Sequence, residues 1–397
     1  MRRQWLYIIV GLIATVVFFF SNENLRGYLQ CDACLGKEIQ ADQDSLYQYK
    51  LADKVPFKYR ILFPTIVKAS HKAVFGENNS IGFYYTYKFW SWFFYVSSAC
   101  LLFYLLKIAG FDDGISLTGA IIFILLPPML MAYTLPVHTR EDPLAYTILL
   151  LGLVCLVKDK KIIFVFVSIA GALCRETLLL LPMLYFFFAG DKILWRRLII
   201  PAIPGVVWLL LRISIRHEQY DVAEGFNWNN NNPEQVIGFL FITFNVLWIP
   251  FVIHTIRFKH NLQNTNTVRL FFSRSSLLTL SVILLTTYFG GIYNEIRLLY
   301  LLAPWFIVMA AGFLESYGTQ IKEMILTKGY MTFIFSAMIV CAILMHFILK
   351  YQSVLIVPGK YAVPYHLWII ISVIYLCITI IFIPVSVKIL LKEIKHA

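Results

Sequence analysis

A polar stretch near the start of the chain carries residue types that could do chemistry. Residues 42–64 read DQDSLYQYKLADKVPFKYRILFP, which is the longest polar run near the front of an otherwise apolar sequence. A carboxylate can take a proton from a hydroxyl group, and lysine and arginine bind phosphate. The stretch therefore predicts a site for an anionic lipid head group, built from Asp42, Asp44, Tyr47, Lys58, Tyr59 and Arg60.

Further polar clusters interrupt or flank apolar segments later in the chain. They are His138 with Arg140, Glu141 and Asp142; Arg175 with Glu176; Arg212, Arg216 and His217; Asn294, Glu295 and Arg297; and Lys360, Tyr361 and His366. An ionisable group at membrane depth costs roughly 2.5–3.5 kcal/mol, so such groups mark functional positions or paired structural bridges. For one cluster either interpretation holds. Because all of them fall on one predicted side, we expect a shared site for an anionic ligand.

The residue types indicate a particular chemistry. Several arginines with few acids suit a phosphate or diphosphate, which guanidinium groups bind in a bidentate manner. Neighbouring aromatic rings suit a prenyl chain and the faces of sugars. One carboxylate could deprotonate an acceptor hydroxyl while a phosphate, a good leaving group, departs.

The composition predicts the scaffold that must position these groups. Of the 397 residues 59% are hydrophobic and 14% charged, with a mean hydropathy of +0.73. A soluble chain could not keep so much apolar surface from water, so we predict an all-α integral membrane protein. The net charge of +12 fits basic cytoplasmic loops rather than nucleic-acid binding.

Apolar windows of about 20 residues predict about twelve transmembrane helices. The expected spans are residues 5–20, 81–108, 115–135, 144–157, 162–174, 177–189, 198–213, 236–256, 277–289, 298–314, 331–349 and 367–387. Basic residues flank the predicted inner ends, so both termini are expected in the cytoplasm and the polar clusters outside. Residues 21–80 form the first outer loop, in which residues 61–73 are expected to be an interfacial helix. The pair Cys31 and Cys34 is either a local disulfide or two free thiols.

The order of these motifs resembles the GT-C superfamily of integral-membrane glycosyltransferases, which use polyprenyl-phosphate sugar donors. The similar motifs are DSLYQYKLA at 44–52, YRILFP at 59–64, EDPLAY at 141–146, ALCRET at 172–177 and EIR at 295–297. The resemblance covers residues 1–310 as a catalytic transmembrane module, and residues 311–397 carry two further helices without recognisable motifs.

The resemblance implies roles for individual residues. Asp44 would be the base or orient the acceptor, with Asp42 competing for that role, and Glu141 and Asp142 would assist. Arg60, Arg140, Arg175, Arg297 and Lys58 would hold the donor phosphate, and Tyr47, Tyr59, His138, Glu176 and Glu295 would line the substrate pocket. No cofactor is expected, although some relatives place a divalent metal between acidic loops. Ser45 stands where the family usually has glycine.

The implied partners are a polyprenyl-phosphate sugar, a glycan or glycolipid acceptor and the lipid of an inner or plasma membrane. One alternative is an O-antigen or capsule polymerase or ligase, which normally carries its large functional loop late in the chain. Another is a lipid-linked glycan flippase or small-solute transporter, for which two similar halves and polar groups at mid-membrane are typical. The early acidic loop favours the GT-C interpretation.

Overall fold

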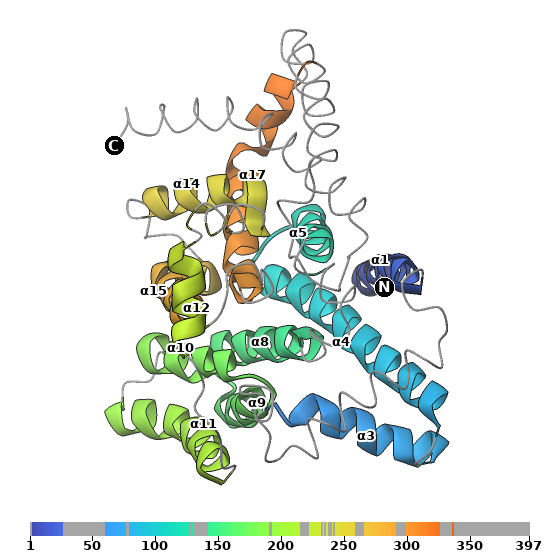
Figure 1. Ribbon diagram of the computed structural model, residues 1–397. Helices are drawn as coiled ribbons and strands as arrows, with labels where there is room; N and C mark the ends of the chain where they lie inside the picture. Colours follow the sequence, from blue (N-terminus) through green and yellow to red (C-terminus); the bar gives the residue numbers. More distant parts are fainter. Residues whose placement is uncertain are drawn as a thin grey trace.

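A computed structural model shows a bundle of helices (Figure 1). It describes residues 2–26, 60–76, 79–126, 142–189, 193–214, 222–231, 243–258, 266–290 and 299–325, together with a few single residues. Within these ranges all regular structure is helical and there is no strand. The predicted all-α fold is therefore confirmed for this part of the chain.

Four of the described helices are long and apolar enough to cross a membrane. They cover Ile81–Ile108, Leu194–Ser214, Thr267–Phe289 and Tyr300–Glu323. Five further predicted spans contain shorter apolar helices of 10–17 residues, such as Asp142–Val157 and Lys161–Cys174. The chain thus has the helices of a membrane protein. The predicted spans 331–349 and 367–387 lie outside the described residues.

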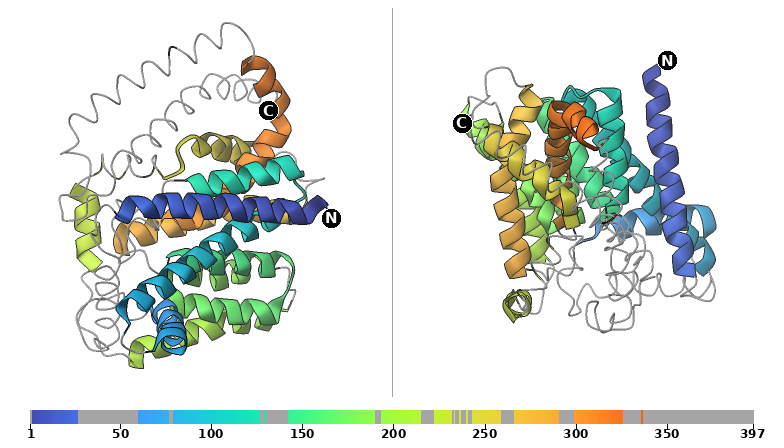
Figure 2. Two further views of the ribbon diagram at one scale, coloured as in Figure 1. Left: turned by 90° about the vertical axis from the view of Figure 1, so that its right-hand side faces the viewer. Right: turned by 90° about the horizontal axis from the view of Figure 1, so that it is seen from above.

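The first two long helices run in opposite directions. Helix α1 (Arg2–Arg26) packs along α4 (Ser80–Ile108). The Trp92 indole donates to the Thr15 hydroxyl at 3.1 Å. Cys100, which lies after Trp92 on α4, contacts the carbonyl of Tyr7, which lies before Thr15 on α1. Residue numbers that rise on one helix fall on the other, so the pair is antiparallel, as predicted. In Figure 2 the axes of α1 and α15 are about parallel, and the two helices lie on opposite sides of the bundle.

Helix α3 (Leu62–Phe75) confirms the helix expected in the first predicted outer loop. It folds back on the start of α4, with Phe63 against Tyr87 and His71 against Phe83. Gly76 ends the helix with a φ of 78°, a conformation that costs a residue without a Cβ little. Asn79 then caps α4 by accepting a hydrogen bond from the backbone N–H of Gly82.

Helices α8, α9 and α10 form a tightly packed up-and-down unit. Helix α8 (Asp142–Val157) runs parallel to α4, since Thr147 bonds to the Phe94 carbonyl and Lys158 bonds to Tyr104. Helix α9 (Lys161–Cys174) returns, and the short helix η2 (Glu176–Leu179) leads into α10 (Leu180–Phe188).

The two arms on either side of Arg175 are separate antiparallel helices rather than one tilted helix. The ring of Tyr185, near the end of α10, lies 5.2 Å from that of Phe164, near the start of α9. Leu181 of α10 contacts the backbone of Gly152 in α8, so closely that a Cβ there would lie 2.6 Å from its side chain. The turn at Arg175 and Glu176 therefore lies at the same end of the unit as the start of α8, as predicted.

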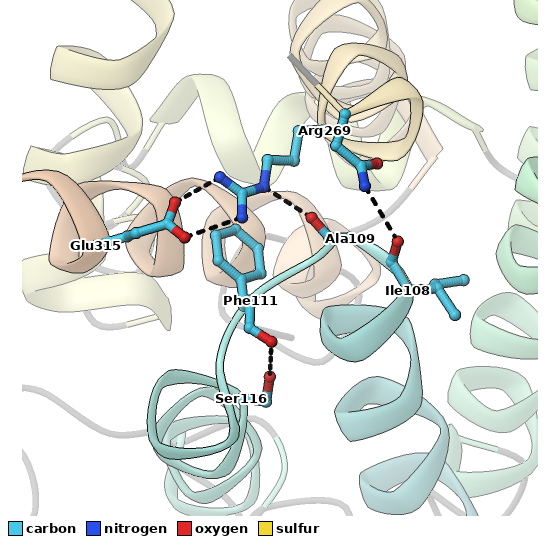
Figure 3. Close-up of polar contacts among 7 residues, drawn as sticks. Ile108, Ala109, Phe111, Ser116, Arg269 and Glu315 are labelled. Atoms are coloured by element: carbon cyan, nitrogen blue, oxygen red, sulfur yellow. Dashed lines mark hydrogen bonds and ion pairs between the residues drawn. The ribbon is translucent and has the colours of Figure 1, made fainter. Parts of the chain in front are cut away.

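The opposite end of the bundle is held by a cluster around Arg269 (Figure 3). Arg269 of α15 (Thr267–Gly290) donates to the Ala109 carbonyl at 2.7 Å and pairs with Glu315 of α17 (Ala303–Ile325). Its guanidinium also lies 4.0 Å from the ring centre of Phe111. This one side chain joins α15, α17 and the turn between α4 and α5 (Asp113–Leu125). Trp305 bonds to Ser275 further along, which makes α15 and α17 antiparallel.

Two predicted segments differ from the structure, and a third has the break expected at its prolines. Helix α5 ends at Leu125, and Leu126 is extended because the residue before a proline is pushed out of the helical conformation; residues 130–135 of the expected span 115–135 lie outside the described residues. The expected span 236–256 is interrupted at Asn245, whose φ is 47°, before α14 (Trp248–Phe258). The segment between the expected spans 198–213 and 236–256, for which no helix is predicted, contains α12 (Val222–Asn231), where Asn229 is buried against the end of α15.

Candidate functional site

Four of the predicted site residues, drawn from three distant segments, come together at one end of the bundle. Arg60 precedes Ile61, the N-cap residue of α3, and Asp142 is the first residue of α8. Arg175 and Glu176 form the turn between α9 and η2. Salt bridges join Arg60 to Glu176 and Arg175 to Asp142. We call these four residues the charge cluster.

The pair of Asp142 and Arg175 is completely enclosed. The side chain of Asp142 is 0% exposed and that of Arg175 is 1% exposed. Removing two ions from water costs several kcal/mol each, and only close pairing offsets that cost. Asp142 also lies at the positive end of the α8 dipole, which stabilises a carboxylate. Both groups are therefore expected to stay ionised and bound to one another.

The pair of Arg60 and Glu176 is bidentate and slightly more open. The guanidinium Nε lies 3.2 Å from Oε2 and a terminal nitrogen lies 2.7 Å from Oε1. The Arg60 side chain is 6% exposed, and that of Glu176 is 25% exposed. This geometry fixes the planes of both groups, and it ties Arg60, which lies within the predicted first outer loop, to the α9–α10 turn.

The backbone at the turn explains why neighbours in sequence do not pair with each other. Arg175 has φ −160° and ψ 134°, which ends α9 and turns the chain before η2 begins. Successive side chains in an extended segment point in opposite directions. Arg175 consequently faces the start of α8, while Glu176 faces Arg60. The salt bridges of Arg175 and Glu176 are thus made to residues of other segments, while Arg175 also attracts the neighbouring Glu176 carboxylate.

Electrostatics lower the pKa of Glu176. Burial by itself would raise the pKa of this carboxyl, but the guanidinium of Arg60, aided by that of Arg175, brings it below its ordinary value. The charged form of Glu176 is thus the one that the folded protein stabilises.

This shift predicts a pH dependence of stability. A lowered pKa in the folded state gives stabilisation that is present above the ordinary value of 4.5 and is lost as the pH falls through the folded value. We expect the melting temperature of the detergent-solubilised protein to drop below that pH, and Glu176→Gln to weaken the drop. Glu323→Gln, which changes an exposed glutamate of α17, is the control. Equal pH profiles for the wild type and Glu176→Gln would contradict the assignment.

Two further polar side chains at this end were not singled out from the sequence. The Thr177 hydroxyl is buried and has no hydrogen-bond partner within the described part of the chain. Tyr146 lies one turn after Asp142, and its ring centre is 4.7 Å from that of Tyr300, which begins the short helix before α17. The sequence could have indicated Tyr146 through its spacing from Asp142, since residues four apart lie on the same face of a helix.

The remaining predicted site residues lie outside the described residues. They are Asp42, Asp44, Tyr47, Lys58, Tyr59, His138, Arg140, Glu141, Glu295 and Arg297. Each of these segments joins the described part beside the charge cluster or beside Tyr300: Tyr59 precedes Arg60, Glu141 precedes Asp142, and residue 298 precedes Leu299.

The charge cluster limits what its members can do. It holds two guanidinium groups and two carboxylates, so its formal charge is balanced and each arginine already binds a carboxylate. A phosphate would have to share or displace those carboxylates. Asp142 is likewise a poor metal ligand while it faces Arg175, and the other candidate metal ligands, Asp44 and Glu141, lie outside the described residues.

The geometry is therefore that of a rigid, charged framework at the end of a helical bundle where several polar segments begin. No known family model matches the chain, and no curated protein is similar to it in sequence.

Proposed function

We propose that the chain is a membrane glycosyltransferase of the GT-C type. It moves a sugar from a polyprenyl-phosphate donor to a glycan or glycolipid acceptor on the extracytoplasmic side. The observation that carries this proposal is the charge cluster of Arg60, Asp142, Arg175 and Glu176. These residues meet although Arg60 and Glu176 are 116 positions apart in the sequence. These are the four predicted site residues that the structure describes.

The cluster supports the proposal because it holds Arg60 and Asp142, the residues at which the segments with the two acidic motifs join the described part of the chain. Arg60 follows the segment with Asp42 and Asp44 and is tied to Glu176, while Asp142 follows Glu141 and is tied to Arg175. A transferase needs its base and its phosphate-binding groups held in fixed positions before the substrate arrives. Salt bridges buried in a helical framework provide that rigidity.

The proposed membrane arrangement has about twelve spans, with both termini in the cytoplasm. The relative directions of the described helices support it: α1 is antiparallel to α4, α4 is parallel to α8, and α9 runs back between α8 and α10. In this arrangement the charge cluster lies on the outer side and the Arg269 cluster lies on the inner side.

The reaction divides the basic residues into two groups. Asp44 accepts the proton of the acceptor hydroxyl, whose oxygen attacks the anomeric carbon as the bond to the donor phosphate breaks. Arg60 and Arg175, each bound to a carboxylate, maintain the framework and contribute to the electrostatic potential at the site. The departing phosphate is bound directly by Lys58, Arg140 and Arg297. His138, Tyr47, Tyr59 and Glu295 complete the sugar pocket.

A transfer assay tests the function. Purified protein in lipid vesicles is given labelled polyprenyl-monophosphate sugars and a membrane extract as the acceptor source. We expect label to move to the acceptor fraction, with release of polyprenyl phosphate. Transfer only from a diphosphate donor would point to the polymerase or ligase alternative. Movement of the lipid across the bilayer without transfer would contradict the enzyme and favour a flippase.

A further inference from the structure

A cavity lies at the end of the α8–α10 unit opposite the charge cluster. It has a volume of about 640 Å³ and is enclosed by the end of α8, the start of α9, the end of α10 and the start of α15. That volume is within the range of sites that hold small organic molecules. None of the residues given a role in transfer lines it, so what it binds is a separate question from the proposed function.

The walls of the cavity are apolar and aromatic. The rings of Phe164, Tyr185, Phe188 and Phe271 line it, together with aliphatic side chains at the end of α8. Phe164 and Tyr185 pack on each other, and Phe188 meets Phe271 edge to face at 6.1 Å, so the walls are built from rings already fixed by neighbours. Such a lining suits a hydrocarbon chain and offers little to a small hydrophilic ion.

The rim of the cavity is basic. Lys160 and Lys161 line it beside Asp159, which lies 3.8 Å from Lys161. Within the described part of the chain Lys160 has no ion-pair or hydrogen-bond partner for its ammonium group. Arg197 bonds to the carbonyl of Ala189, another residue of the lining, which adds a second positive charge from α11 (Leu194–Ser214).

The backbone at the rim adds further attraction for an anion. Lys160 is the N-cap of α9 and makes no side-chain capping bond, so the first N–H groups of α9 have no side-chain acceptor from that position. The positive end of the helix dipole and the two lysines then point to the same place. A basic rim around an apolar chamber is complementary to an anionic amphiphile.

We propose that this cavity binds an anionic phospholipid, with its phosphate at Lys160 and the start of α9 and an acyl chain against the aromatic walls. Charge complementarity selects the anionic head group, and the enclosed apolar lining selects a lipid over free phosphate. Basic pockets between membrane helices bind such head groups in this manner. The inference does not depend on the proposed function.

Native mass spectrometry of the full chain tests this proposal. The protein is titrated in mild detergent with phosphatidylglycerol or phosphatidylcholine, and the apparent affinity of the first bound lipid is measured. We expect phosphatidylglycerol to bind more tightly, and Lys160→Gln to weaken its binding about fivefold while leaving phosphatidylcholine unchanged. Lys322→Gln, an exposed lysine near the end of α17, is the matched control and is expected to bind like the wild type.

Three outcomes would overturn the proposal. Equal binding of both lipids would show that charge plays no part. An equal loss in Lys160→Gln and Lys322→Gln would indicate general attraction to the basic surface. Complete competition by millimolar inorganic phosphate would identify a free-anion site. Because Lys160 is exposed, we expect the variant to fold like the wild type, and its phosphatidylcholine binding and melting temperature check this.

Discussion

Replacing Arg175 with methionine is expected to lower the free energy of unfolding by about 3–5 kcal/mol. The change leaves the Asp142 carboxylate completely buried without its guanidinium partner. A buried charge without compensation is among the most destabilising features that a single substitution can create. The measurement is reversible unfolding in detergent–lipid mixtures or, failing reversibility, the melting temperature.

The double variant Asp142→Asn/Arg175→Met separates charge from shape. Because it removes both charges while keeping similar volumes, we expect it to recover most of the stability that Arg175→Met loses. Arg196→Met removes an exposed arginine on α11 and is expected to change stability by no more than about 0.5 kcal/mol. If Arg175→Met melts like the wild type, the enclosed ion pair is not a feature of the folded protein.

Asp44→Asn is expected to reduce the rate of sugar transfer about 10²–10⁴-fold, the usual contribution of a general base. The amide keeps the size of the side chain and removes its ability to accept a proton. Donor binding, measured separately with labelled polyprenyl-phosphate sugar, should persist, since the proposal assigns the phosphate to Lys58, Arg140 and Arg297. The readout is a fall in turnover at saturating donor.

Asp42→Asn is the matched control because it makes the same chemical change two residues earlier. We expect it to retain transfer within a few-fold of the wild type. The reverse pattern, with only Asp42→Asn inactive, would assign the base to Asp42. Full activity in both variants would remove these carboxylates from the mechanism.

The sequence predicted the helical framework well for clear physical reasons. Apolar windows ended by charged residues fix where a helix can lie in a membrane, and α9 and the α10 arm end within one or two residues of the predicted spans. The clustering of Arg60, Asp142, Arg175 and Glu176 at one end follows from the same alternation of directions. A residue at the end of a span must lie on the side where that span ends.

The pairing within the cluster could not be predicted in this way. Which carboxylate faces Arg175 depends on the extended backbone at one residue and on how α9 packs against α8, and neither leaves a periodic signal. The interruption at Asn245 was hidden for a related reason, since hydropathy alone does not report a positive φ. Helix α12 was missed because it has no continuous apolar face: the polar Asn229 is the residue that packs against the end of α15, and its amide bonds to the Tyr288 carbonyl.

The shortness of α9 has a consequence for the surrounding lipid. Fourteen helical residues span about 21 Å, whereas the hydrocarbon core of a bilayer is about 30 Å thick. Ile162, Ile163 and Phe166 lie on the exposed face of α9 and meet acyl chains there. Hydrophobic mismatch of this kind is relieved by thinning the leaflets around the short helix. In the proposed membrane arrangement, such thinning would bring the head-group layer closer to Arg60 and Glu176, and so bring the proposed lipid-linked donor closer to the charge cluster.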